Sequence, residues 1–210
     1  MFKKMTVLAA VVVALMSFTP AYGYFITSTG DSALSGAYVD DMSMWIPGDW
    51  IAAYHLLPPN QSYIAVDNHF WFDSTYSGQW NMTGQYLDNG TYSDEGFSAL
   101  KIGFGGGTSA FGFHWGASDY QWALTAYDAS DTAIESYSLP ITHASSAGEF
   151  YGIAASNIAY ALLTNVSGTY DWVMIDDLHI AASAVPVPGA LWLLGTGLVR
   201  LLGLRRKISR

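Results

Sequence analysis

The chain contains no cysteine, and between Tyr24 and Ser183 its only lysine or arginine is Lys101. Without cysteine the fold cannot depend on disulfides, although a segment of about 160 residues buries enough surface to be stable without them. One lysine cannot neutralise a phosphate backbone, which excludes nucleic acid as a partner. The 17 acidic residues of the chain all lie in this segment and, against one lysine, give it a formal charge of −16. That charge favours solubility and attracts divalent cations, above all calcium outside the cell.

The same segment also lacks a sustained helical repeat. Its apolar residues instead alternate with a period of two, in short aromatic and β-branched runs that end at turn-forming sequences such as Gly105-Gly106-Gly107. The residues expected to share one face within each run are Leu100, Ile102 and Phe104; Phe111, Phe113 and Trp115; Trp122, Leu124 and Ala126; Ile158, Tyr160 and Leu162; and Trp172, Met174, Asp176, Leu178 and Ile180. The pattern predicts an all-β fold, a single antiparallel β-sandwich or jelly roll over residues 24–183.

Long hydrophobic runs occur only at the two ends of the chain. At the amino end, Lys3 and Lys4 precede an apolar run from Thr6 to Phe18. Small residues then occupy Ala21 and Gly23, the positions that a signal peptidase inspects. Residues 1–23 are therefore interpreted as a signal peptide, cleaved by signal peptidase between Gly23 and Tyr24.

The carboxyl end combines a proline-bracketed break, a short apolar segment at residues 189–204 and a basic cluster. As a helix, that segment would be roughly 24 Å long, which is shorter than the ~30 Å hydrocarbon core of a bilayer. A short transmembrane segment of this kind fits a processed signal better than a permanent anchor, the alternative interpretation. The residues that carry this pattern are Val185, Pro186, Val187, Pro188, Gly189, Arg205 and Arg206.

This tail, residues 184–210, resembles the PEP-CTERM sorting signal of Gram-negative bacteria. The resemblance implies that the exported precursor is held in the inner membrane until an exosortase removes its tail. It also implies a mature protein that is secreted or displayed at the cell surface, in the exopolysaccharide or biofilm matrix. The sequence departs from the family pattern in two places, because Val187 stands where the motif has glutamate and Arg200 interrupts the apolar segment.

The placement of charge supports the same topology. Seven of the eight basic residues lie in the leader and the tail, whereas all the acidic residues lie between these two ends. The positive-inside rule then places both termini of the precursor in the cytoplasm. The acidic segment between them lies on the other side of the inner membrane. We expect an exported protein.

Residues from about Phe97 to Ala182 also resemble the jelly-roll domains that often precede such a tail. The similarity lies in Phe111-Gly112-Phe113-His114-Trp115-Gly116, in Phe150-Tyr151-Gly152-Ile153 and in Val173-Met174-Ile175-Asp176-Asp177-Leu178. Asp176 shares a predicted face with apolar residues, and a buried carboxylate must be neutralised, hydrogen-bonded or bound to metal. Two readings stay open: a structural calcium site, which the jelly-roll resemblance favours, or a carboxylate that caps a loop through backbone N–H groups.

Three classes of function are compatible with these features. The first is a non-enzymatic matrix protein, and we expect no enzyme. The second is a carbohydrate-binding module, for which Trp71 and Trp80 are the candidate glycan contacts. They belong to the glycine-, serine- and asparagine-rich stretch around Asp73 to Gly84. The third is an extracellular glycoside hydrolase, which would need two carboxyl groups facing each other across a cleft.

Overall fold

The structure is a computed structural model that describes residues 23–49, 51, 55–57, 61–66, 70–90, 99–143 and 149–182. The predicted signal peptide up to residue 22 and the predicted sorting tail lie outside these residues. No helix in the described part of the chain is long and apolar enough to span a membrane.

The described residues form an all-β fold, as the sequence predicts. All of their strand pairs are antiparallel. The only helix among them is η1, a single 3-10 turn at Ser32–Leu34. The strands are β1 (Tyr24–Ile26), β2 (Tyr38–Asp40), β3 (His55–Leu57), β4 (Gln61–Ala65), β5 (Trp71–Asp73), β6 (Tyr86–Asp88), β7 (Ala99–Gly116), β8 (Trp122–Tyr127), β9 (Ala133–Leu139), β10 (Glu149–Asn165) and β11 (Met174–Ile180).

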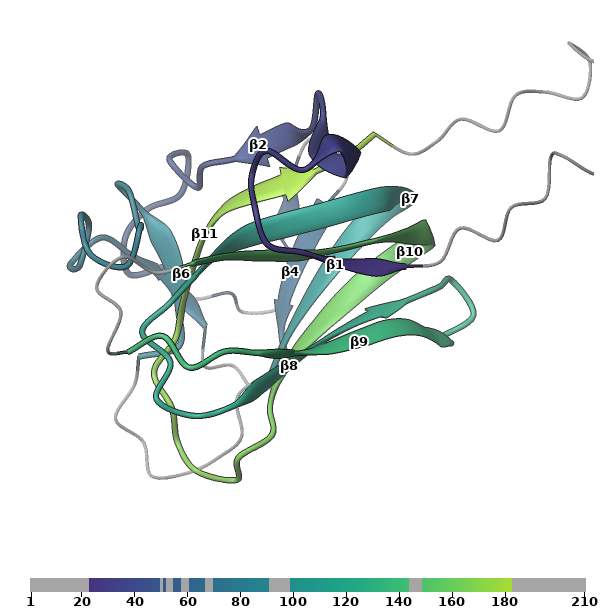
Figure 1. Cartoon of the computed structure of the whole chain (residues 1–210). Helices are drawn as coiled ribbons and strands as arrows, with labels where there is room; N and C mark the ends of the chain where they lie inside the picture. Colours follow the sequence, from purple (N-terminus) through teal and green to yellow (C-terminus); the bar gives the residue numbers. More distant parts are fainter. Residues whose placement is uncertain are drawn as a thin grey trace, which may run out of the picture.

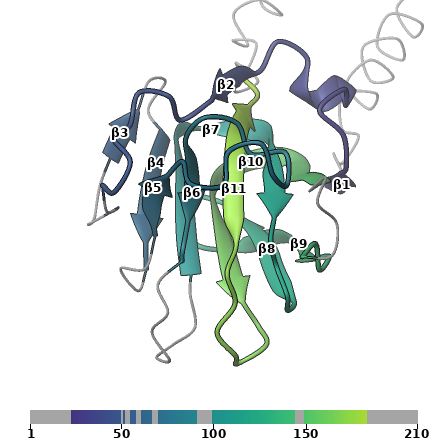
Figure 2. The ribbon, with the colours of Figure 1, turned by 90° about the vertical axis from the view of Figure 1, so that its left-hand side faces the viewer.

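The two long strands, β7 and β10, each take part in both layers of a sandwich. Residues 99–104 of β7 and 160–165 of β10 lie in one layer, in the order β3-β4-β7-β10-β8-β9. Residues 110–116 of β7 and 149–154 of β10 lie in the other layer, between β11 and β1. There β6 and β2 pair with opposite ends of β11, and β5 extends the sheet beyond β6. The layers face each other (Figure 1), and Figure 2 shows β6 beside β11.

Both long strands bend where they pass between the layers. Gly106 and Gly107 have φ angles of +87° and +77°, and Asn157 on β10 has a φ of +61°. Such angles are easy for glycine and tolerated by asparagine. The predicted turn at Gly105-Gly106-Gly107 is therefore wrong, because the triplet bends one continuous strand and separates no two strands.

The bend also switches which side chains of β7 face inward. The main core takes Leu100, Ile102 and Phe104 before the bend and Phe111, Phe113 and Trp115 after it, as the sequence pattern predicts for both runs. On β10 the prediction is only partly correct. Ile158 is buried, but register shifts turn Tyr160 and Leu162 outward, and Ala161 and Leu163 are buried in their place.

The main core fills the space between the layers. It draws aromatic side chains from both arms of β7, including Phe104, Phe111 and Trp115, and packs them against Trp122 of β8 and Ile175 of β11. A smaller cluster lies apart from this core, around Met82, Tyr86, Ala117 and Met174. That cluster forms the floor of the site described below.

The ladder between β7 and β10 depends on a glycine pair. Gly152 lies opposite Gly112, and a Cβ atom on Gly152 would lie 2.0 Å from the carbonyl oxygen of Phe111. Backbone cannot yield as a flexible side chain does, so we expect Gly152→Ala to lower the free energy of unfolding by roughly 2 kcal/mol or more.

Urea denaturation of the variant and the parent measures this loss. Gly30→Ala is the matched control, because its Cβ would meet only the Ser28 hydroxyl oxygen at 3.6 Å. Equal midpoints for Gly152→Ala and Gly30→Ala would contradict the packing described for the ladder.

Candidate functional site

Three connections pass between the two layers at one end of the sandwich. Residues 117–121 lead from β7 to β8, residues 140–143 leave β9 towards β10, and residues 166–173 lead from β10 to β11. The loop between β5 and β6 joins them from the side, lying across the outer face of β11 in Figure 2. Side chains that are distant in sequence therefore meet at this end.

Four rings form what we call the aromatic surface: Tyr76, Trp80, His143 and Trp172. All but His143 are half-buried. The Trp172 ring meets Tyr76 edge-on at 4.6 Å between centroids and Trp80 edge-on at 6.1 Å. His143 lies beyond Trp80, with 6.2 Å between ring centroids. The rings lie against one another, so each is held by its neighbours and still remains partly exposed to solvent.

Two glycines make room for the two indole rings. A Cβ atom on Gly116 would lie 2.5 Å from the Cβ of Trp80, and one on Gly90 would lie 2.6 Å from Nε1 of Trp172. The indole of Trp80 donates to the carbonyl oxygen of His143 at 3.4 Å. Trp80 and Asn81 also have positive φ angles, 50° and 62°, which places this ring at the tip of a tight turn.

Trp172 is fixed by a buried carboxylate. Its Nε1 donates to Asp88 at 3.1 Å, and the same carboxylate accepts a hydrogen bond from the backbone of Gly90. Burial raises the pKa of Asp88 to about 6, although both hydrogen bonds oppose the shift. The next residue, Asn89, exchanges hydrogen bonds with Asp171 and Val173 and so ties the β6 end to the segment that carries Trp172.

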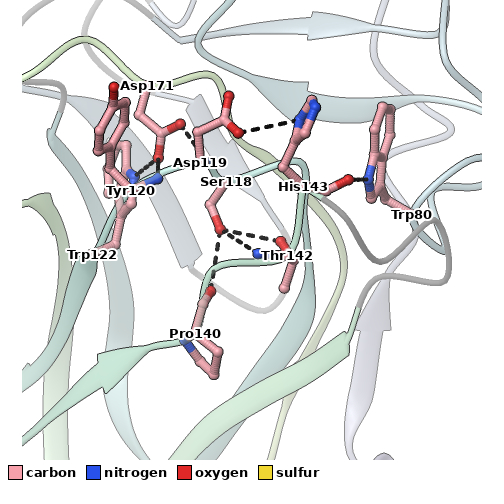
Figure 3. Close-up of polar contacts among 9 residues, drawn as sticks. All are labelled: Trp80, Ser118, Asp119, Tyr120, Trp122, Pro140, Thr142, His143 and Asp171. Carbon is pink, nitrogen blue, oxygen red and sulfur yellow. Dashed lines mark hydrogen bonds and ion pairs between the residues drawn. The ribbon is translucent and has the colours of Figure 1, made fainter.

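A second buried carboxylate, Asp171, holds two of the crossing connections together. It accepts hydrogen bonds from the backbone N–H groups of Asp119 and Tyr120 at 2.7 and 3.1 Å, and from the indole of Trp122 at 2.8 Å. Figure 3 shows these three donors converging on the one side chain. Burial raises the pKa of Asp171, against the effect of those hydrogen bonds.

Ser118 joins the third connection, residues 140–143, to the connection at residues 117–121 (Figure 3). Its hydroxyl donates to the carbonyl oxygen of Pro140, accepts from the backbone of Thr142 and lies 3.1 Å from the Thr142 hydroxyl. The backbone N–H groups of Thr142 and His143 also donate to the Ser118 carbonyl. His143 is thereby held in place, although its own side chain is exposed.

The exposed polar group of the surface is the pair formed by His143 and Asp119. Nδ1 of His143 lies 3.7 Å from Oδ1 of Asp119, and both side chains are about half exposed, at 52% and 55%. An ion pair this exposed adds little stability, which leaves both groups free to exchange partners with a ligand.

Asp176, the predicted metal ligand, is fully buried on the outer side of β11. It accepts hydrogen bonds from the backbone N–H of Thr83 at 2.6 Å and from the Thr83 hydroxyl at 3.2 Å. The predicted face shared with Leu178 and Ile180 is wrong, because Asp177 has a φ of +47° and forms a bulge that shifts the register. Leu178 and Ile180 pack in the main core, whereas Met174 and Asp176 face the β5–β6 loop.

The hydrogen bonds to Asp176 are those expected of a carboxylate that caps a loop. Within the described ranges no group of three or more histidine, aspartate or glutamate side chains could hold a metal ion. Calcium binding at Asp176 is not tested by these contacts and stays a prediction.

The structure separates the two predicted glycan contacts. Trp80 belongs to the aromatic surface, whereas Trp71 lies half-buried on β5, paired through its backbone with Asp88. At the amino end, β1 begins at Tyr24, the predicted first residue of the mature chain, and Gly23 packs against Glu135. Neither glycan contact nor signal cleavage is tested by this placement, and both stay predictions.

Sequence reasoning missed Tyr76, Asp119, His143 and Trp172 as members of one surface. The alternation of Trp172 with Met174 predicts a core residue, but Trp172 is half-buried and its indole donates to Asp88. The tryptophans themselves indicate that buried carboxylates could be present, since each buried indole N–H needs a hydrogen-bond acceptor. Which acceptor each indole finds depends on the crossing of the layers, which is not local in sequence.

No protein-family model matches the chain. No curated protein matches it either. Similar solved structures include the adhesin domain of Lys-gingipain from Porphyromonas gingivalis, with 12% identity and a TM-score of 0.46 over 70% of this chain and 99% of that one.

Two further structures are a mutant family 29 carbohydrate-binding module and the enzymatically active domain of a bacteriophage tailspike protein. The module has 11% identity and a TM-score of 0.41 over 67% of this chain and 97% of that one. The tailspike domain has 12% identity and a TM-score of 0.41, with 62% of this chain and only 19% of that one covered. With TM-scores below 0.5, these likenesses carry no inference about function.

The buried carboxylates predict a dependence of stability on pH. Burial raises the pKa of Asp176 to about 7, above its ordinary value of 3.8. A raised carboxyl pKa contributes stability that is fully present below the ordinary value and is lost as pH rises through about 7. We therefore expect a larger free energy of unfolding at about pH 5 than at about pH 8, as measured by urea denaturation.

Asp176→Asn should reduce that difference by at least about 1 kcal/mol, since one pKa unit corresponds to about 1.4 kcal/mol. Asp119→Asn removes the same charge from an exposed position and serves as the matched control. An unchanged pH difference in Asp176→Asn would refute the assignment.

Proposed function

We propose that this protein is an exported, non-catalytic polysaccharide-binding domain of the extracellular matrix. The observation that carries the proposal is the aromatic surface, in which three half-buried rings lie beside the exposed pair of His143 and Asp119. Aromatic faces accept the C–H faces of sugar rings, and a few polar groups beside them fix the orientation of the hydroxyls.

The rigidity of the surface supports a binding function. The residues that carry its rings come from the β5–β6 loop, from the end of β9 and from the segment before β11, and hydrogen bonds to Asp88, Asp171 and Ser118 hold these segments. A surface fixed before the ligand arrives loses less entropy on binding. Mobile rings would have to be ordered at the expense of affinity.

The two ends of the chain support the extracellular setting. The leader at residues 1–23 and the tail at residues 184–210 are those of an exported precursor, and the tail resembles an exosortase substrate. Signal peptidase and exosortase are its proposed partners during export, with the inner membrane as a transient anchor. The acidic segment between them, with one lysine, suits a soluble matrix protein.

A hydrolase is the second candidate, and the carboxylates of the surface argue for binding instead. Asp88 and Asp171 are buried and accept hydrogen bonds from the protein's own backbone and indole groups. On the aromatic surface itself the exposed carboxylate is Asp119, beside His143. Glu149, which begins β10 opposite Trp115, is also exposed at this end of the sandwich. A hydrolase would need a second carboxyl group across the sugar.

Removing Trp80 should weaken polysaccharide binding. We expect Trp80→Ala to lower the affinity for exopolysaccharide of the native host by at least about tenfold, as is usual for a central aromatic contact. Isothermal titration calorimetry on the purified, exported protein measures the change.

Tyr38→Ala is the matched control, because Tyr38 is an exposed aromatic residue that pairs with Ile180, at the opposite end of β11. Gly116→Ala keeps every ring but forces Trp80 to move, and it should weaken binding in the same direction. Full affinity in both Trp80→Ala and Gly116→Ala would refute the proposed site.

Processing at both ends gives an independent prediction. The mature protein from the native host should begin at Tyr24 and lack everything after about Pro188, because signal peptidase and exosortase remove the two ends. Intact-mass spectrometry of the extracellular fraction measures both cuts. A full-length species that retains Arg210 would contradict the proposed sorting.

A further inference from the structure

The aromatic surface lies in a protein with almost no positive charge to offer a ligand. Between Tyr24 and Ser183, 17 acidic residues stand against Lys101 alone. The ammonium group of Lys101 lies 3.7 Å from the ring centroid of Tyr160. That ring also stacks on Tyr127, and its hydroxyl donates to Asp131. The single lysine is therefore already engaged on the outer face of β7 and β10, and the group of the aromatic surface that can carry positive charge is His143, which lies beside Asp119.

Negative groups, in contrast, lie next to the rings of the surface. Asp88 accepts the hydrogen bond of the Trp172 indole, and Asp119 is exposed beside His143. Asp73 accepts a hydrogen bond at 3.4 Å from the Tyr86 hydroxyl, which in turn accepts one from the backbone N–H of Tyr76. The faces of Tyr76, Trp80 and Trp172 add the negative potential of their π-electrons.

Both features act in the same direction on a charged ligand. Carboxylates and ring faces attract an ammonium group, whereas a carboxylated or sulfated glycan meets repulsion with no lysine or arginine to relieve it. Each exposed charge contributes little by itself, but their sum sets the sign of the field that a long polymer meets.

We infer that the aromatic surface is selective for polysaccharides that carry free amino groups, such as partly deacetylated amino-sugar polymers, and that it rejects anionic polysaccharides. This inference rests on the proposed polysaccharide-binding function and names the ligand class of that site. The sugar ring packs on Trp80 while its ammonium group lies near Asp119.

Three oligosaccharides of equal length test the selectivity: an oligomer of glucosamine, its fully N-acetylated form and an oligomer of uronic acid. Calorimetry on the purified, exported protein is run at about pH 7, above the pKa of about 6 for Asp88, and at about 30 mM salt. Charges are then screened only weakly, since the Debye length is nearly 20 Å. We expect the glucosamine oligomer to bind at least about tenfold more tightly than the N-acetylated one, and the uronic-acid oligomer not to bind. Raising the salt to about 300 mM should reduce the preference for the amine.

Two variants separate the contributions. Trp80→Ala should weaken both binding oligomers, whereas Asp119→Asn should weaken the glucosamine oligomer alone. Polylysine of similar length is the control for bulk charge. Binding of polylysine as tight as that of the glucosamine oligomer, and equally tight in Trp80→Ala, would overturn the inference.

The remaining outcomes distinguish this inference from the proposed function. Equal affinity for the amine and N-acetylated oligomers, or tighter binding of the uronic-acid oligomer, would overturn the selectivity. If that binding still depended on Trp80, polysaccharide binding itself would stand. If none of the oligomers bound, and the native exopolysaccharide did not bind either, both would fail.

Discussion

The fold depends on the pairing of β7 with β10 along two strands that bend together. Each strand is long enough to serve both layers, and the pairing runs from Glu149 opposite Trp115 to Thr164 opposite Ala99. The bend is possible because Gly106 and Gly107 adopt positive φ angles where β10 carries Asn157. Since the same two strands lie in both layers, the layers cannot slide or separate without breaking this ladder.

That arrangement also explains where the candidate site lies. Strands β7, β9 and β10 all end at one end of the sandwich and are followed by connections to the other layer. Such crossings leave backbone N–H groups without sheet partners, and buried polar groups must be satisfied. Asp171 and Ser118 satisfy several of these groups and join the connections in doing so. The aromatic surface rests on segments held in this way.

The carboxylates link the stability of the domain to the presentation of its rings. Asp88 holds Trp172, and Asp176 holds Thr83 in the loop that carries Trp80. Both are buried, no lysine or arginine within the described ranges pairs with them, and burial raises their pKa values to about 6 and about 7. In an acidic protein with one engaged lysine, protonation is one means of neutralising such carboxylates.

Much of the sandwich could be predicted from local alternation, because buried strands repeat every second residue. The inward faces of both arms of β7 and of β8 were predicted correctly in this way. The two irregular positions could not be predicted. Gly105-Gly106-Gly107 has the composition of a turn between strands, and Asp176-Asp177 fits the alternation of a regular strand. The site was also largely hidden: Trp80 was a candidate, but its contacts with Trp172 and His143 join segments more than 60 residues apart.

The indole N–H groups report most directly on whether this surface binds sugar. Two-dimensional NMR of the 15N-labelled protein, titrated with oligosaccharides from the native exopolysaccharide, resolves each indole resonance. The account predicts that the Trp80 and Trp172 resonances shift progressively with ligand. The Trp115 resonance should not shift, because this indole is buried in the main core and donates a hydrogen bond to the carbonyl oxygen of Pro140. Shifts confined to tryptophans outside the aromatic surface would contradict the assignment of the site.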